Sequence, residues 1–327
     1  MLGFVEITPW HWAGFILCVV FFLALDLGLF HRQARPVRFW EAAAWSALWF
    51  VLAMAFAGAM FYWRGREEAA QFTTGYIIEL SLSMDNVFVI ALIFAFFRVP
   101  SQFQHRVLFW GILGALLMRG VMIAAGAALV QNFRWTLYLF GAFLVFTGIR
   151  MLLIKDAGVH PEKNLLVRGA RKFFPVTGDL HGQKFLTRID GRLLLTPLAL
   201  VLLVVETSDL IFALDSIPAI FAVTTKPFIV FTSNVFAILG LRSLYFLLVG
   251  AIDYFRYLKV GLSSVLVFIG VKMLLDPHGH EPKRFQIEIP IGVSLMTVAT
   301  IILIAIVLSV MVAEREKRTG NGNLPKP

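Results

Sequence analysis

The chain has 327 residues, of which 59% are hydrophobic and 15% are charged, and its mean hydropathy is +0.81. This composition excludes a soluble globular protein, because a water-facing surface cannot be built with so few polar residues. The net charge of +9 does not indicate a nucleic-acid partner, because the charges lie in short segments between long apolar runs and form no basic stripe with interleaved aromatic residues. The expected partner is the lipid bilayer.

Cysteine chemistry contributes nothing to the expected function. The single cysteine, Cys18, lies inside an apolar run. A disulfide framework and a Cys/His zinc motif are therefore excluded, and the sequence does not support redox chemistry. No prosthetic group is expected.

Nine apolar runs are long enough to cross a bilayer, which takes about 20 helical residues. We expect an all-α polytopic bundle that forms one transmembrane domain over 1–327. No lysine or arginine precedes Arg32, so the first run lacks the basic region of a cleavable signal peptide and should be retained. The spans are expected near residues 9–29, 40–62, 74–97, 107–130, 135–154, 196–222, 228–249, 255–275 and 288–312.

Basic residues are distributed unevenly between the two sets of loops. One set holds the basic segment 155–195 and the start of the tail 313–327, whereas the alternate loops hold few basic residues. The positive-inside rule then predicts an N-terminus outside and a C-terminus in the cytoplasm. We expect 155–195 to be a cytoplasmic loop that is solvated or touches anionic lipid, and 313–327 to be a disordered cytoplasmic tail.

An internal repeat relates the middle six spans. Spans three to five, over 74–154, repeat as spans six to eight, over 196–275, and the last matching segments are 122 residues apart. Because each unit has three helices, the second copy enters the membrane from the opposite side, which is the inverted repeat typical of secondary transporters. The matching segments are 83–88 with 207–212, 112–114 with 238–240, and 143–153 with 265–275.

Acidic and polar side chains gather where each repeat begins. Five ionised, unpaired carboxylates inside a membrane would cost about 12 to 18 kcal/mol, at about 2.5 to 3.5 kcal/mol each, so they are candidates for a functional site. The third span holds Glu79, Ser81, Ser83, Asp85 and Asn86, and the sixth holds Glu206, Thr207, Ser208, Asp209, Asp215 and Ser216.

Helical geometry brings part of this set together. At about 100° per residue, Glu79, Ser83 and Asn86 share one face of the third span, and Glu206 and Asp209 lie together in the sixth. Two oxygen-rich faces can then meet between the two spans.

Asp85 and Asp215 fall about 120° from their nearest acidic partners in regular helices. Pro218 removes a backbone donor and crowds the carbonyl of Leu214. We therefore expect the sixth span to break over 215–218, which would turn Asp215 toward the site, as broken helices do in many transporters.

The donor chemistry of the two spans predicts the ligand class. Carboxylate, amide and hydroxyl oxygens suit Mg, Ca or Mn, whereas Cu(I) or Zn would recruit thiolate, thioether or imidazole. Neither span contains cysteine or histidine. Protonation of the carboxylates in the absence of the ion would couple export to proton uptake.

A structural explanation competes with this ion site. Asp85 and Asp209 can instead pair with Arg119 and Arg242, which lie at related places in spans four and seven. Both explanations can hold together, because an arginine can orient one carboxylate while others hold the ion. Asn234 in span seven can offer its carbonyl oxygen to the ion or join two helices, and Asp26 in span one is an interfacial acid or a gate.

An enzyme is not expected. Asp85 and Asp209 could imitate the dyad of an intramembrane aspartyl hydrolase, but the flanking glycine pattern is missing. Transport also explains the additional acids better than hydrolysis does.

Residues 79–88, 206–220 and 233–245 resemble the TerC family, and 24–28 also fits, so that the resemblance covers nearly the whole chain. It implies a bacterial inner-membrane protein, related to LysE-type exporters, that exports Mn2+. The family is named for tellurium resistance, and a non-transporting assembly or tellurite-stress factor is the alternative. The metal, the energy coupling and the oligomeric state stay open. Carried over by position, the ligands are Asp85, Asn86, Glu206, Asp209, Asp215 and Glu79. The residue pattern itself adds expected supporting or gating roles for Asp26, Ser83, Arg119, Pro218, Asn234 and Arg242.

Overall fold

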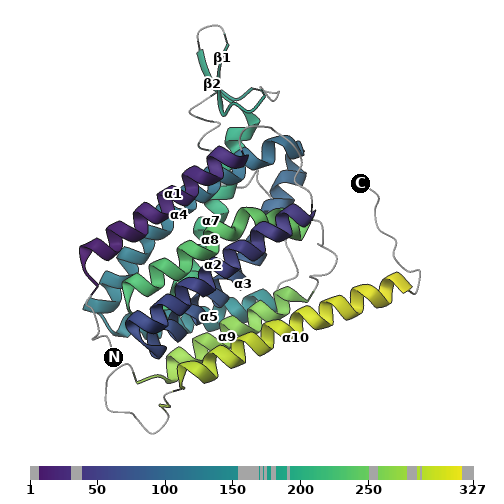
Figure 1. The fold of residues 1–327 in the computed structure, drawn as a ribbon. Helices are drawn as coiled ribbons and strands as arrows, with labels where there is room; N and C mark the ends of the chain where they lie inside the picture. Colours follow the sequence, from purple (N-terminus) through teal and green to yellow (C-terminus); the bar gives the residue numbers. More distant parts are fainter. Residues whose placement is uncertain are drawn as a thin grey trace.

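The computed structural model describes residues 7–30, 39–153, 169, 172, 175–177, 182–189, 192–249, 257–277, 286–287 and 289–318. Over these residues the chain is a helical bundle with one small β-hairpin (Figure 1), which confirms the predicted all-α polytopic fold. In chain order the elements are α1 (Pro9–Phe30), α2 (Phe39–Arg64), α3 (Arg66–Phe96), α4 (Ser101–Asn132), α5 (Trp135–Leu153), β1 (Leu186–Ile189), β2 (Arg192–Leu195), α7 (Pro197–Phe221), α8 (Pro227–Val249), α9 (Leu258–Leu275) and α10 (Ile291–Arg318).

Each of the nine predicted spans corresponds to a helix. Eight of the described helices, all except α1, are long and apolar enough to cross a membrane, and α1 has a shorter apolar stretch over Pro9–Ala24. Helices α3 and α4 begin several residues before their predicted spans, at Arg66 and Ser101. These early turns are polar, so hydropathy alone does not detect them.

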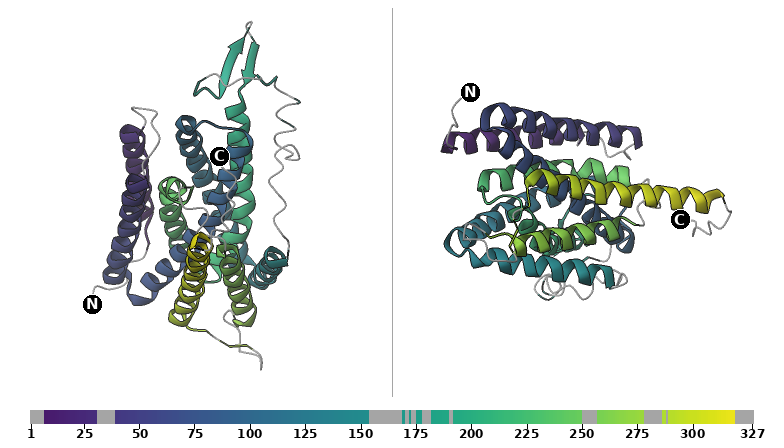
Figure 2. Two further views of the ribbon diagram at one scale, coloured as in Figure 1. Left: turned by 90° about the vertical axis from the view of Figure 1, so that its right-hand side faces the viewer. Right: turned by 90° about the horizontal axis from the view of Figure 1, so that it is seen from below.

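Two connecting segments differ from the loops that the sequence predicted. In the 155–195 segment, β1 and β2 pair as an antiparallel hairpin that projects from the start of α7 (Figure 2). At the C-terminus, α10 continues to Arg318, so the first part of the expected disordered tail is helical. The rest of the tail and most of 155–195 lie outside the described residues.

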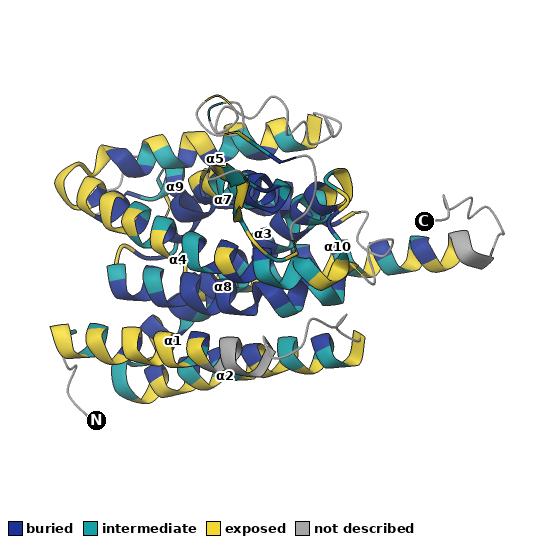
Figure 3. Cartoon of the chain, turned by 90° about the horizontal axis from the view of Figure 1, so that it is seen from above, coloured by how far each residue is buried: buried dark blue, intermediate teal, exposed yellow. Residues whose placement is uncertain are grey.

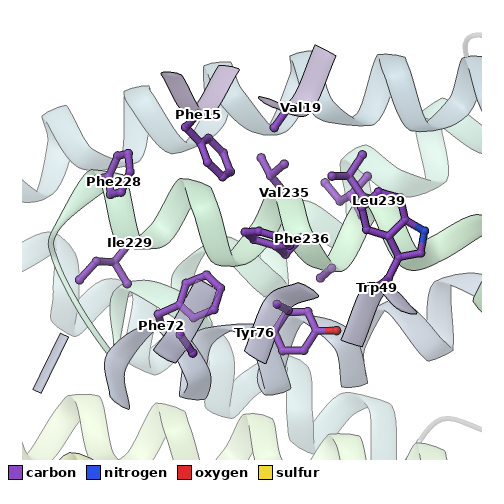
Figure 4. Close-up of a cluster of buried hydrophobic side chains, with 14 of the residues drawn as sticks. Phe15, Val19, Trp49, Phe72, Tyr76, Phe228, Ile229, Val235, Phe236 and Leu239 are labelled. Carbon is purple, nitrogen blue, oxygen red and sulfur yellow. The ribbon is translucent and has the colours of Figure 1, made fainter. Parts of the chain in front are cut away.

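Helix α8 lies at the centre of the bundle. In its apolar window 78% of the residues are buried, compared with 17% in α2 and 22% in α10, as expected for a helix that is apolar on all sides. Helix α2 packs on α8 and α3, and α1 and α2 form a layer on one side of the bundle (Figure 3). This layer contacts α3 and α8 through an aromatic cluster, drawn in Figure 4, that includes Phe15, Trp49, Phe72, Phe228 and Phe236.

The helix contacts are arranged as an inverted repeat requires. Helix α3 packs on α8 and α4 packs on α7, which are equivalent pairs when the two units are exchanged, and α5 packs on α9. In the α5–α9 contact, an added Cβ at Gly148 would lie 3.0 Å from the Ser263 carbonyl oxygen, and one at Gly270 would lie 2.7 Å from the Gly141 carbonyl oxygen. Gly148 and Gly270 are 122 residues apart, and so are Gly141 and Ser263, so each of these two contacts is the repeat equivalent of the other. This reciprocity supports the predicted repeat.

The predicted break in the sixth span is wrong. Helix α7 continues through Pro218 to Phe221, and the Ala222 N–H donates to the Pro218 carbonyl oxygen at 3.1 Å. Pro218 lies in the last turn of the helix, where it removes only the hydrogen bond to the Leu214 carbonyl. Residues 216–221 are all buried, so packing holds the last turn in place despite that loss.

Candidate functional site

A buried charged cluster lies where α3, α4 and α7 meet. Helix α7 packs on both α3 and α4, and each helix contributes side chains from its middle third. The exposed fractions are 0% for Glu79, 1% for Asn86, 3% for Arg119 and 4% for Asp209, so water does not screen their charges. Glu79 and Asn86 are seven residues apart, which is two turns along one face of α3, as predicted.

Arg119 of α4 joins the carboxylates of the other two helices. Its Nε and Nη2 donate to Oδ2 and Oδ1 of Asp209 at 3.2 and 3.0 Å, which is a forked, bidentate pair. Its Nη1 forms an ion pair with Glu79 Oε1 and donates to Ser216 Oγ at 3.4 Å. Asp209 is thus paired with Arg119, one of the two arginines that the sequence offered as partners of Asp85 and Asp209, whereas the second partner of Arg119, Glu79, was not predicted.

Two buried oxygen atoms of this cluster accept no hydrogen bond from any described residue. Asn86 donates through Nδ2 to Asp209 Oδ1 at 2.7 Å, but no described donor reaches its other side-chain atom, Oδ1. Glu79 Oε2 also accepts no hydrogen bond from a described donor. A buried polar atom without a partner costs about 1 to 3 kcal/mol, so native proteins rarely keep one without a role. With one guanidinium and two carboxylates, the ionised cluster keeps an excess of one negative charge. Both features favour the binding of a cation.

Glu206 lies beside this cluster, one turn before Asp209 on α7. Its half-buried carboxylate rests against Gly114 of α4, in the space that a side chain at Gly114 would fill. At the equivalent position in the second repeat, Gly240 faces Trp49 of α2, 3.6 Å from an added Cβ. The two matching glycines therefore accept different side chains, an acid in one repeat and an indole in the other.

Asp215 is not brought to the cluster. It is six residues beyond Asp209, and it faces Thr147 and Arg150 of α5. Because α7 remains helical, Asp215 stays on a different face of the helix from Asp209. In the part of the chain that the structure describes, no three Asp, Glu, His or Cys side chains are close enough to hold a metal ion. The cluster is thus a mixed set of carboxylate, amide and guanidinium groups.

The other predicted residues lie on the same or neighbouring helices. Ser83 is buried between Glu79 and Asn86 on α3, and Asp85 on that helix is half-buried. On α8, Arg242 is buried, and both side-chain amide atoms of Asn234 are buried without a described hydrogen-bond partner. The side chain of Asp26 lies outside the described residues.

Fold and site together define a multi-pass membrane protein with a buried polar cluster between two packed helical units. The chain belongs to the family described as "Integral membrane protein TerC family", whose model matches residues 64–317. This confirms the resemblance seen in the sequence motifs.

Three relatives illustrate the similarity. The chain is 50% identical to "Uncharacterized membrane protein STKORF319" of Myxococcus xanthus, over 98% of this chain and 97% of the relative. It is 47% identical to "Putative membrane-bound redox modulator Alx" of Salmonella typhi, over 95% and 97% of the two chains. It is 38% identical to "Uncharacterized membrane protein" of Rickettsia felis, over 92% and 97%. No solved structure matches the chain.

Proposed function

We propose that this protein is a secondary transporter that exports a divalent metal ion, Mn2+ by preference, through the cluster of Glu79, Asn86 and Asp209. The observation that carries the proposal is the pair of buried oxygens, Glu79 Oε2 and Asn86 Oδ1, that accept no hydrogen bond from the described residues. Hard oxygen donors of this kind suit Mn, Mg and Ca. Glu206, one turn from Asp209, adds a further carboxylate beside the cluster, where a passing ion can meet it before or after the site.

The depth of the remaining acids, Asp85 and Asp215, relates them to this site. With the proposed orientation, N-terminus outside and C-terminus in the cytoplasm of a bacterial inner membrane, α3 runs inward and α7 runs outward. Asp85 then lies on the cytoplasmic side of Glu79, and Asp215 lies on the outer side of Asp209. Asp85 therefore lies at the depth of the cluster, between Glu79 and Asn86, and an ion on its way out would meet Asp215 last, while the two repeats move against each other.

Flux measurements in proteoliposomes test this function. The purified protein is reconstituted, and the movement of Mn2+, Mg2+ and Ca2+ is followed with an ion-sensitive dye for the wild type, Asp209→Asn and Glu314→Gln. Glu314 is an exposed carboxylate near the end of α10, so its substitution is the matched control. We expect Mn2+ flux in the wild type and in Glu314→Gln, and a loss of flux in Asp209→Asn. Absence of flux in the wild type would refute the transporter.

The names of the Alx relatives raise redox modulation as a second function. This chain has one cysteine, Cys18, so it lacks the second thiol that an intrachain thiol–disulfide couple needs. A non-transporting assembly or stress factor remains the principal alternative, and an enzyme is not proposed. Asp209→Asn distinguishes the transporter from the assembly factor, because this substitution should abolish ion movement and spare an assembly role.

A further inference from the structure

Arg119 occupies the oxygen atoms that a transported ion needs. Both oxygens of Asp209 accept hydrogen bonds from its guanidinium, at 3.0 and 3.2 Å, and Glu79 Oε1 is in its ion pair. Among the carboxylate oxygens of Glu79 and Asp209, only Glu79 Oε2 is therefore left for another cation. A Ca2+ or Mg2+ ion takes about six or more oxygen ligands at about 2.0 to 2.6 Å, which one free oxygen and the amide of Asn86 cannot supply.

The ion and the guanidinium are consequently alternatives. A metal ion bound to Asp209 would lie at the place where Nε and Nη2 now lie, and two cations at that distance repel strongly in a buried site. The charges favour exchange as well. Arg119 leaves the Glu79 and Asp209 pair with one negative charge, whereas a divalent ion in its place neutralises both carboxylates.

We propose that Arg119 is a tethered cation that competes with the transported ion for Glu79 and Asp209. This inference rests on the proposed export function. In the empty protein the guanidinium holds α3 and α7 together through the two carboxylates, and it leaves them when the ion binds. Burying two unpaired carboxylates is strongly unfavourable, so the empty site needs this guanidinium when it moves from facing one side of the membrane to facing the other.

The competition predicts opposite effects on binding and on net transport when Arg119 is replaced. If the guanidinium occupies the site most of the time, the apparent affinity for the ion is the intrinsic affinity multiplied by the small fraction of time for which the site is free. Removing the guanidinium should tighten ion binding. It should also leave exchange of bound Mn2+ for Mn2+ across the membrane intact, while net export stops, because exchange never requires the empty site to move.

The test compares Arg119→Gln with Arg134→Gln, which removes an exposed arginine just after the end of the same helix. Binding of Mn2+ to the purified proteins is measured by calorimetry, and radioactive Mn2+ exchange and net efflux are measured in proteoliposomes. For Arg119→Gln we expect a Kd lower by about tenfold or more, exchange close to wild type and net efflux lost. Arg134→Gln should match the wild type in all three assays.

Several results would overturn the proposal. If Arg119→Gln melts like the wild type but binds Mn2+ no more tightly, Arg119 is a structural residue. If this variant does not fold, Arg119→Lys decides the question: a lysine keeps the charge but cannot bridge both acids with a fork, so its Kd should lie below that of the wild type, and a Kd equal to or above wild type refutes competition. A wild type that neither binds nor moves Mn2+ would instead refute the proposed export function itself.

Discussion

Gly148 on α5 and Gly270 on α9 lie at equivalent positions of the two repeats, and each lies against the backbone of the other's helix. An added Cβ at Gly148 would be 3.0 Å from the Val267 nitrogen, and one at Gly270 would be 2.8 Å from the Val145 nitrogen. Without a hydrophobic driving force between helices in lipid, close backbone approach at small residues is a main source of helix association. This crossing is therefore a stabilising contact between the two units.

Gly270→Ala should destabilise the protein by about 1 to 3 kcal/mol, because the new methyl group would meet backbone atoms that cannot move away without separating α5 from α9. The melting temperature in detergent measures the effect. Gly58→Ala on α2 is the control, since nothing lies within 4 Å of a Cβ at that position. Equal melting temperatures for both variants would show that the α5–α9 crossing is not close-packed.

The long elements of this fold could be predicted from the sequence because apolar run length determines a membrane span directly. The place of Asp209 and Glu79 in a buried cluster was equally predictable, since acids within apolar runs must find partners. The bridge from Arg119 to both acids was not. It depends on the rotation and depth of three different helices, and Arg119 and Asp209 are 90 residues apart along the chain. Spacing within one helix carries no such information.

Pro218 shows a second limit of sequence reasoning. A proline inside an apolar run signals a lost hydrogen bond but not whether the surrounding packing can replace its energy. Here the residues of the last turn of α7 are buried and the helix continues. The sequence held only an indirect sign that Glu206 lies against Gly114. A glycine recurs at the equivalent position, Gly240, which marks a place where another side chain approaches the helix closely.

Gly114→Ala should reduce Mn2+ flux, whereas Gly240→Ala should not. A methyl group at Gly114 would overlap the carboxylate of Glu206, and this flexible side chain would move out of its slot rather than disrupt the fold. At Gly240 the methyl group would be 3.6 Å from the Cβ of Trp49, which is an ordinary contact. Flux in proteoliposomes and melting temperatures for both variants check this. Equal flux in the two variants would remove Glu206 from the proposed site.

Glu68 joins three parts of the chain near the start of α3. Its carboxylate accepts hydrogen bonds from Arg64 Nε and Nη2 at 2.6 and 2.9 Å and from Lys226 Nζ at 2.7 Å. The side chain of Glu68 is 6% exposed and that of Lys226 is 47% exposed. Glu68→Ala removes the largely buried carboxylate that Arg64 and Lys226 share, so both ion pairs are lost at once and the cost should be about 3 kcal/mol, whereas Lys226→Met should cost at most about 1 kcal/mol.

Thermal unfolding of the two variants measures this difference. The expected order of melting temperatures is wild type, then Lys226→Met slightly below it, then Glu68→Ala well below both. A larger loss for Lys226→Met than for Glu68→Ala would mean that the exposed lysine contributes more to the stability of this part of the bundle than the carboxylate of Glu68 does.

The hairpin and the turn after α4 should lie on opposite sides of the membrane. Arg106, near the start of α4, stacks on Phe185 beside the hairpin at 5.3 Å, so the residues that follow the far end of this 32-residue helix lie about 45 Å away. The distribution of basic residues places the hairpin in the cytoplasm. A membrane-impermeant maleimide should then label Arg134→Cys in intact cells.

Both cysteine variants are made in a Cys18→Ala background, which removes the native cysteine. Lys184→Cys, exposed next to the hairpin, should react only after permeabilisation, because the hairpin is expected on the cytoplasmic side. Both substituted positions are exposed, so a difference in labelling reports the side of the membrane and not burial. The opposite pattern would reverse the orientation of the bundle. Asp215 would then lie on the cytoplasmic side of Asp209, and an exported ion would meet it before the cluster rather than after it.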